Sequence, residues 1–202
     1  MVSAKALKNV DISEEIAGFS SILVRDGGVY ISTRETPLLV QTPALVFDTD
    51  LTEDDTFVNI RPKNTTFFKE VENAVLALAL VNKGSWFRED IADDLITNSL
   101  RSFVEDDTVR VRVSEGFVAF DVNKTRIPFP VAAGVRVKAV LELERITFSK
   151  TQFGAVWNLK QVRLVEDNRY LFDEDVVEGL AEEMNESILL AETDEELVST
   201  IE

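Results

Sequence analysis

Residues 134–165 read GVRVKAVLELERITFSKTQFGAVWNLKQVRLV, and the rest of the chain can be interpreted around this segment. Apolar and polar side chains alternate over residues 135–143 and again over residues 155–165, which is the period of a strand with one buried face. A connection at about residues 149–153 separates the two runs. We therefore predict two long strands joined as a hairpin, along which basic and aromatic side chains are interleaved.

Shorter segments of strand character precede this hairpin. Residues 20–25 and 29–33 flank the sequence Asp-Gly-Gly at 26–28, which favours a tight hairpin turn. Residues 37–48 are largely apolar, but they include Pro37 and Pro43. Because proline cannot donate a hydrogen bond to a neighbouring strand, we expect this segment to be an edge strand or a broken one.

Two more strands are expected on either side of a helical region. Residues 57–60 form a short strand after a polar loop. Residues 108–113 read TVRVRV, which places the valines on one face and Arg110 and Arg112 on the other. Ser-Glu-Gly at 114–116 predicts a turn into another strand over residues 117–122.

The helical region lies between these strands. Residues 67–81 are rich in helix formers and follow Asn-Thr-Thr at 64–66, which favours a helix start. Gly84 predicts a left-handed helix stop, and a second helical piece is expected over residues 89–95. The side chains predicted to be buried recur at three-to-four spacing: Phe68, Val71, Val75, Leu78 and Ala79.

Many short strands interrupted by one helical region indicate a mainly β, α+β fold, specifically an OB-fold-like small β-barrel. We expect one barrel domain over residues 1–165, with an N-terminal arm and a helical insertion at about residues 66–98. Residues 166–202 are expected to form an acidic C-terminal tail that is partly an amphipathic helix.

The chain contains neither cysteine nor histidine. This excludes disulfides, a Ser-His-Asp or thiol mechanism, and metal sites built on imidazole or thiolate. The acidic pairs Asp93-Asp94 and Asp106-Asp107 could hold Mg²⁺, but no glycine-rich phosphate loop accompanies them. We therefore expect a binding protein and not an enzyme, with no metal or cofactor.

The sequence also predicts where the protein resides. No apolar run reaches the ~18 residues of a transmembrane helix. The N-terminus lacks the apolar segment of a secretory signal. We therefore expect an intracellular protein that has no membrane partner.

Charge is distributed unevenly along the chain, whose net charge is −16. Residues 166–202 contain 14 Asp and Glu residues and one Arg, a net charge of −13, whereas residues 1–165 contain 23 acidic and 20 basic residues, a net charge of −3. A strongly acidic protein repels nucleic acid. The nearly neutral body, however, has enough clustered Arg and Lys for a local basic groove.

Single-stranded nucleic acid binds to barrels through basic grooves and through aromatic rings that stack on bases. The candidates for such a site are Arg110, Arg112, Lys124, Arg126, Arg136, Lys138, Lys150 and Lys160, together with Phe148, Phe153 and Trp157. A second interpretation stays open for both groups. Alternating Val and Arg is also typical of any strand with one solvated face, and large aromatic residues are often core residues.

The acidic tail also has two interpretations. It could be a solvated end, or it could imitate nucleic acid, compete for the basic groove and recruit basic partners. The candidate partner-binding residues are Asp173, Glu174, Asp175, Glu182, Glu183, Asp194, Glu195 and Glu196. Apolar residues at helical spacing, among them Val176, Leu180, Met184 and Ile188, indicate docking on another surface.

The order of these features resembles a known family, the acidic-tailed OB-fold single-stranded-DNA-binding proteins of T7-type phages and nucleocytoplasmic large DNA viruses. The residues that carry the resemblance are GVRVKAVLEL from Gly134, then Phe153 and Gly154, then AVWNLKQVRLVE from Ala155, followed by the acidic tail. QTPAL from Gln41 and NKGSWF from Asn82 are similar to the large-DNA-virus branch.

The resemblance implies sequence-independent binding of single-stranded DNA in viral replication, recombination and repair. It also implies tail contacts with a polymerase or helicase, a homodimer, and a location in the host cytoplasm or nucleus during infection. By position, it places Arg136, Lys138, Trp157 and Lys160 on or beside the groove. An alternative function is a virion structural protein, such as a minor capsid or scaffold protein, whose tail holds neighbouring subunits.

Overall fold

The computed structural model describes residues 4–19, 23–26, 29–87 and 90–165. The chain divides into two compact units, Met1–Val165 and Glu166–Glu202. The second unit lies outside the described residues, and so do the predicted tail helix and the predicted partner-binding carboxylates. Within the described part of the chain, no helix is long and apolar enough to span a membrane.

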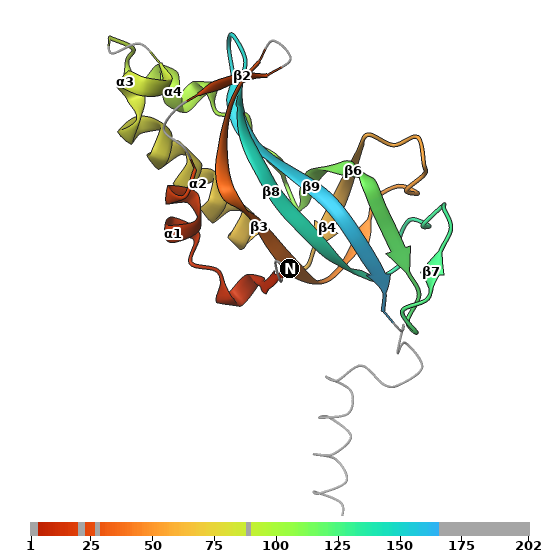
Figure 1. Ribbon diagram of the computed structural model, residues 1–202. Helices are drawn as coiled ribbons and strands as arrows, with labels where there is room; N and C mark the ends of the chain where they lie inside the picture. The colour runs from red at the N-terminus through yellow and green to blue at the C-terminus, as the bar shows by residue number, and fades with distance from the viewer. Residues whose placement is uncertain (1–3, 20–22, 27–28, 88–89, 166–202) are drawn as a thin grey trace, which may run out of the picture. The chain divides into compact units, whose positions relative to one another are not determined.

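Five long strands close into a ring in which β3 pairs with β4, β4 with β6, β6 with β9, β9 with β8, and β8 with β3 (Figure 1). The pairing of β6 with β9 is parallel, and the others are antiparallel. A five-stranded Greek-key barrel of this kind is an OB-fold, which confirms the predicted fold class. The strands are β3 (Val29–Phe47), β4 (Phe57–Pro62), β6 (Thr108–Phe120), β8 (Val137–Phe148) and β9 (Phe153–Leu164).

Short strands extend this ring. β2 (Val24–Asp26) pairs with β3, and the pairing of Arg25 with Tyr30 forms the hairpin predicted there. β5 (Val104–Glu105) and β7 (Arg126–Ile127) both pair with β6.

The hairpin of β8 and β9 confirms the prediction made from residues 134–165. Its pairing runs from Val137 opposite Leu164 to Phe148 opposite Phe153, and the turn between the strands covers residues 149–152. Alternate side chains of β8 enter the core, where Leu141 is fully buried. Gly134 has a positive φ of 73° where the chain turns into β8, a conformation that favours glycine.

β3 differs from the prediction for residues 37–48, which was wrong. The segment is part of one continuous strand of 19 residues that belongs to the closed barrel. Pro37 and Pro43 lie where the register with β8 shifts, so neither interrupts a regular hydrogen-bonded ladder. Beside Pro43, the hydroxyl of Thr42 accepts a hydrogen bond from the Ala139 amide at 3.0 Å. At this register shift, a side-chain oxygen of β3 thus takes the place of a backbone carbonyl as the acceptor for β8.

β6 corrects the turn predicted at residues 114–116. These residues lie inside a continuous strand of 13 residues, at a register shift between Val113 and Val118. The strand pairs with β4 over residues 109–112, and it pairs with β9 at residues 112–113 before the shift and at residues 118–120 after it. Small and polar residues favour bulges as well as turns, and here they let the strand bend around the barrel.

The helical insertion lies between β4 and β6 and consists of α2 (Thr66–Val81), α3 (Lys83–Trp86) and α4 (Asp93–Ser99). The helices gather on one side of the barrel (Figure 1). α2 begins where the Asn64 side chain accepts a hydrogen bond from the Thr66 amide at 2.7 Å. Four of the side chains predicted to be buried are fully buried: Phe68, Val71, Val75 and Ala79. The fifth, Leu78, is only partly buried.

The end of α2 differs from the prediction. Gly84 lies inside α3 and has no positive φ, so it is not a left-handed stop. Asn82 ends α2 instead, and its side-chain amide donates a hydrogen bond to the Leu78 carbonyl at 2.9 Å. The second predicted helical piece begins later than expected, at Asp93.

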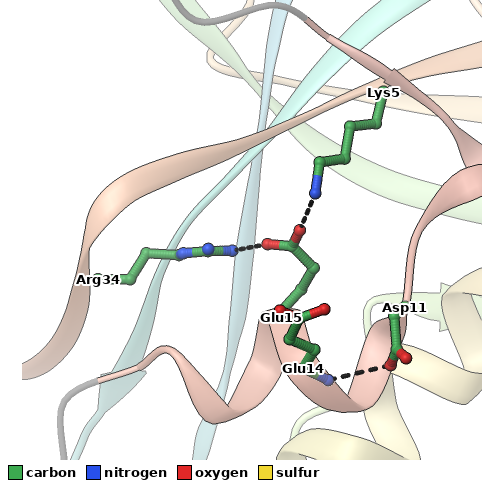
Figure 2. Close-up of polar contacts among 5 residues, drawn as sticks. All are labelled: Lys5, Asp11, Glu14, Glu15 and Arg34. Atoms are coloured by element: carbon green, nitrogen blue, oxygen red, sulfur yellow. Dashed lines mark hydrogen bonds and ion pairs between the residues drawn. The ribbon is translucent and has the colours of Figure 1, made fainter.

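The N-terminal arm consists of β1 (Lys5–Ala6), η1 (Leu7–Asn9) and α1 (Ile12–Ala17). β1 pairs in parallel with β3. The Glu15 carboxylate is buried and accepts hydrogen bonds from Lys5 and Arg34 (Figure 2). Burial raises the pKa of Glu15, but these two cations outweigh it, so the pKa lies below its ordinary value.

Candidate nucleic-acid interface

Four basic side chains line a groove formed by residues of β4, β6, the end of β8 and the start of β9. The groove has a volume of about 510 Å³. Its cations are Arg101, Arg110, Arg112 and Arg145, and no Asp or Glu side chain is among the described residues that line it. We call this site the arginine groove.

Strand alternation places two of these arginines. Val109 and Val111 of β6 are 0% and 1% exposed, so the side chains between and after them point away from the core. Arg110 and Arg112 therefore face outward, and both line the arginine groove, as the TVRVRV pattern predicted.

Phe57 provides an aromatic ring in the same groove. It stands opposite Arg112 in the pairing of β4 with β6, and it is 47% exposed. The guanidinium carbon of Arg110 lies 4.7 Å from the centroid of the ring, which is a cation–π contact. The groove therefore combines positive charge with an aromatic surface that is open to solvent.

Arg101 comes from the connector between α4 and β5. Its backbone amide donates a hydrogen bond to the Phe153 carbonyl at 2.7 Å, which fixes the connector against β9. A Cβ atom on Gly154 would lie 2.8 Å from the Arg101 carbonyl oxygen. Glycine at position 154 therefore permits the close approach that brings Arg101 to the groove.

Glu72 of α2 organises the same connector. One carboxylate oxygen accepts hydrogen bonds from the Ser102 hydroxyl at 2.7 Å, the Phe103 amide at 2.7 Å and the Val104 amide at 3.3 Å. Hydrogen bonds to an ionised acceptor are stronger than neutral ones. The helical insertion thus holds in place the connector whose residues Arg101, Ser102 and Phe103 line the arginine groove.

The charge of the groove is largely uncompensated. Arg101, Arg110 and Arg112 form no ion pair with any described residue. Arg145 does have an acidic neighbour, since its guanidinium lies 3.6 Å from the Glu144 carboxylate. An anionic ligand would therefore meet three guanidinium groups that no described acidic side chain neutralises: those of Arg101, Arg110 and Arg112.

The aromatic residues predicted to stack on bases are core residues, which corrects that expectation. Phe148, Phe153 and Trp157 are 5%, 2% and 1% exposed. They pack against the helical insertion, with ring centroids 5.7 Å apart for Trp157 and Phe68 and 5.0 Å apart for Phe148 and Trp86. Although they line the groove wall, their ring faces are covered, so they cannot receive a base.

The remaining predicted cations do not join the arginine groove. Lys124 and Lys138 line a second depression with Arg163, which we call the lysine depression. Lys160 pairs with Glu142 at 3.3 Å, so its charge is compensated. The other predicted cations are exposed and line neither site: Arg126, Arg136 and Lys150.

Sequence reasoning missed several groove residues. Phe57 precedes Val58 and Ile60, which are 4% and 0% exposed, so strand alternation could have placed it outward. Arg101 lies in a connector with no hydrophobic period, so no signal was available. Arg145 follows a register shift between Leu143 and Arg145, where simple alternation fails.

The acidic pairs considered for Mg²⁺ lie beside basic side chains. Asp93 pairs with Lys83 at 2.7 Å, and Asp107 pairs with Arg61 at 3.2 Å. In the described ranges, no group of three or more acidic residues gathers where it could hold a metal ion.

The strand pairing and the arginine groove define this protein as an OB-fold with a basic groove on its surface. OB-folds bind oligonucleotides and oligosaccharides on the face of their second and third strands and at the loop between the fourth and fifth. In this barrel these elements are β4, β6 and residues 149–152, and each contributes to the arginine groove.

Comparison with known proteins gives a family. The chain belongs to a family of unknown function (DUF5871), whose model matches residues 45–176. Among solved structures, it is similar to the single-stranded DNA-binding protein from bacteriophage Enc34 in complex with ssDNA, at 11% identity and a TM-score of 0.42. That alignment covers 72% of this chain and 95% of that chain. No curated protein matches the chain.

Proposed function

We propose that this protein binds single-stranded DNA in the arginine groove, without sequence preference, as a binding protein and not an enzyme. The observation that carries the proposal is the composition of the groove. Four arginines and the half-exposed ring of Phe57 meet on the ligand face of an OB-fold, and no acidic side chain lines that site within the described chain.

Charge and aromaticity together favour this ligand over the other ligands of OB-folds. A neutral oligosaccharide would gain little from four guanidinium groups, whereas a phosphate backbone would release counterions on contact with them. The exposed ring of Phe57 offers a stacking surface that requires an unpaired base. Single-stranded DNA uses both features, and a duplex would use only the charge.

We further propose the role that the family resemblance implies, in viral DNA replication, recombination and repair. The acidic residues 166–202 would compete with DNA for the basic surface and recruit a polymerase or helicase. Tethering supports such competition, because a linked segment is present at an effective concentration of about millimolar. The same role includes a homodimer in the cytoplasm or nucleus of an infected cell.

The test is the binding of a labelled oligodeoxynucleotide, measured by fluorescence anisotropy over a range of salt concentrations. Replacing Arg110 and Arg112 by alanine should weaken binding and reduce the slope of log K against log[salt] by about 1.4, since each phosphate contact contributes roughly 0.7. The matched control replaces Lys63 and Lys69, which are exposed and line neither basic site. An equal loss in both variants would mean that only the net charge matters.

A chain that ends at Val165 tests the role of the tail. All the described strands and every residue of the described core cluster lie within the first 165 residues, so this truncation removes none of them. We expect tighter binding and a stronger response to low salt than in the full chain, because a net charge of −13 is removed. If the shortened chain does not bind at low salt, the proposed function is wrong.

A further inference from the structure

The lysine depression lies at the opposite ends of the strands that form the arginine groove. It has a volume of about 360 Å³ and is lined by side chains from β3, β6, β8, β9 and the turn after β6. Its cations are Lys124, Lys138 and Arg163, and none of the described residues that line it is acidic. The proposed DNA-binding site does not include this surface.

Strand pairing brings two of the cations together. Lys138 on β8 stands directly opposite Arg163 on β9, and Arg163 stands opposite Phe120 on β6. Like charges that face each other across neighbouring strands destabilise a sheet. A bound anion would remove this repulsion, so the pair favours a ligand that carries negative charge.

Lys124 is placed by a turn with unusual backbone geometry. Its φ is +67°, in the left-handed region that few residues other than glycine adopt. The turn is closed by the Asp121 carboxylate, which accepts a hydrogen bond from the Thr125 amide at 2.7 Å. Among the described residues, Lys124, Lys138 and Arg163 form no ion pair, which leaves their charge available.

The two basic sites lie along the same pair of strands. Arg112 of the arginine groove pairs with Asn158, and Phe120 of the lysine depression pairs with Arg163. The distance from Asn158 to Arg163 along β9 is roughly 16 Å at about 3.3 Å per residue. The two acidic side chains of β8 between the sites, Glu142 and Glu144, are paired with Lys160 and Arg145.

We propose that the lysine depression is a second phosphate-binding subsite, which holds the same DNA strand after it leaves the arginine groove. This inference rests on the proposed function. It gives the DNA a path along β6 and β9, and it predicts that affinity depends on oligonucleotide length. A short oligonucleotide would occupy the arginine groove alone, whereas a longer one would reach Lys138 and Arg163.

The experiment compares oligothymidines of about 4 and about 16 nucleotides, the limits of the site size of an OB-fold. The full chain carrying Lys138→Glu and Arg163→Glu should bind the long oligonucleotide at least about tenfold more weakly, with a smaller salt slope. Binding of the short one should change less than about twofold at about 0.15 M salt, because the Debye length there is about 8 Å. The control carries Lys63→Glu and Lys69→Glu.

The other outcomes separate the two proposals. If the wild-type chain binds neither oligonucleotide, the proposed function fails and this inference fails with it. If the wild-type chain binds both and the variant loses both equally, or no more than the control does, the second subsite alone is refuted. Circular dichroism checks that the variant is folded, and Lys138→Gln with Arg163→Gln provides a neutral pair that should show the same length dependence.

An acidic peptide would meet the same charges, and residue 166, where the acidic tail begins, is three positions after Arg163. The chain that ends at Val165 distinguishes this occupant. A DNA subsite predicts that the charge reversal weakens binding of the long oligonucleotide in both the full and the shortened chain. A loss seen only in the full chain, or tighter binding by the full-length variant, would assign the depression to the tail and overturn the inference.

Discussion

At the residue scale, the groove depends on one aromatic ring that the core does not use. Phe57 is 47% exposed, whereas its neighbour Val58 is 4% exposed. Exposing half of a phenyl ring to water brings no folding benefit, and the contact with the Arg110 guanidinium is worth only about 0.5–1 kcal/mol at an exposed site. A stacked base would bury the ring and use the adjacent positive charge.

Replacing Phe57 by alanine should therefore weaken binding of single-stranded DNA. The expected loss is about 1–3 kcal/mol, the usual value of one stacked base, or roughly 5-fold to 150-fold in Kd. Phe57→Tyr should bind within about twofold of the wild type, since it keeps the ring. Both are measured by anisotropy, and equal affinity of the alanine variant and the wild type would remove Phe57 from the site.

Glu15 gives a prediction about stability and pH. Because its pKa is lower in the folded chain than its ordinary value of 4.5, its ionised form stabilises the fold above that pH. The contribution is lost as the pH falls through the folded pKa. Glu15→Gln should lower the free energy of unfolding at pH 7 by about 1.5–3 kcal/mol, the range for hydrogen bonds to charged groups.

Urea denaturation at pH 7 and about pH 3.5 measures this difference, which should shrink at the lower pH, because about pH 3.5 lies below the ordinary value of 4.5 and folding must then release the proton that Glu15 holds in the unfolded chain. Glu14→Gln is the control, since Glu14 is exposed on the same helix. If Glu15→Gln and the wild type differ in free energy of unfolding by the same amount at both pH values, the carboxylate charge is not what stabilises the arm.

Single residues show how far the sequence could predict the site. The alternation of Val and Arg predicted that Arg110 and Arg112 face away from the core, and this orientation is confirmed, because period two follows directly from strand geometry. The period alone could not show whether Trp157 and Phe153 are core residues or stacking surfaces. The same pattern occurs on a strand face covered by helices and on a strand face that contacts a ligand. The deciding observation is the packing of Phe68 of α2 on Trp157 and of Phe87, just after α3, on Phe153.

At the element scale, the helical insertion positions part of the arginine groove without lining it. Glu72 of α2 binds the backbone of residues 103 and 104, and the connector before them carries Arg101 into the groove. The insertion therefore has a role beyond covering the core. Its position relative to β9 sets where one of the four arginines lies.

Glu72→Ala should reduce DNA affinity although it removes a negative charge, which by itself would strengthen binding. The physical reason is the loss of three hydrogen bonds that position the connector. If Glu72 acts through Arg101, the losses caused by Glu72→Ala and Arg101→Ala will not add in a double-mutant cycle. Glu70→Ala, exposed on the same helix, is the control, and tighter binding by Glu72→Ala would refute the positioning role.

The errors of prediction at this scale have one cause. Pro37 and Pro43 predict an edge strand or a broken one, and residues 114–116 predict a turn, but all of them lie at register shifts within long strands. The residue types that end a strand also permit a bulge, and a small barrel needs bulges to curve. Sequence alone cannot distinguish them, because the deciding factor is the partner strand.

At the scale of the whole molecule, barrel closure leaves the outer faces of the strands as the main surface for ligands. A closed ring has no long free edge that could add a further strand. Two basic sites lie on the outer surface of β6, β8 and β9, although residues 1–165 carry a net charge of −3. The distribution of charge, more than its total, therefore favours a nucleic-acid ligand.

The most direct test of the proposed binding site is an NMR titration of the isotopically labelled full chain with an oligothymidine at low salt. The amide signals of Phe57, Arg101, Arg110, Arg112 and Gly154 should move most, because these residues surround the arginine groove. Unchanged spectra, or shifts confined to the exposed face of α2 around Glu70 and Val81, would contradict the assignment of single-stranded DNA to this groove.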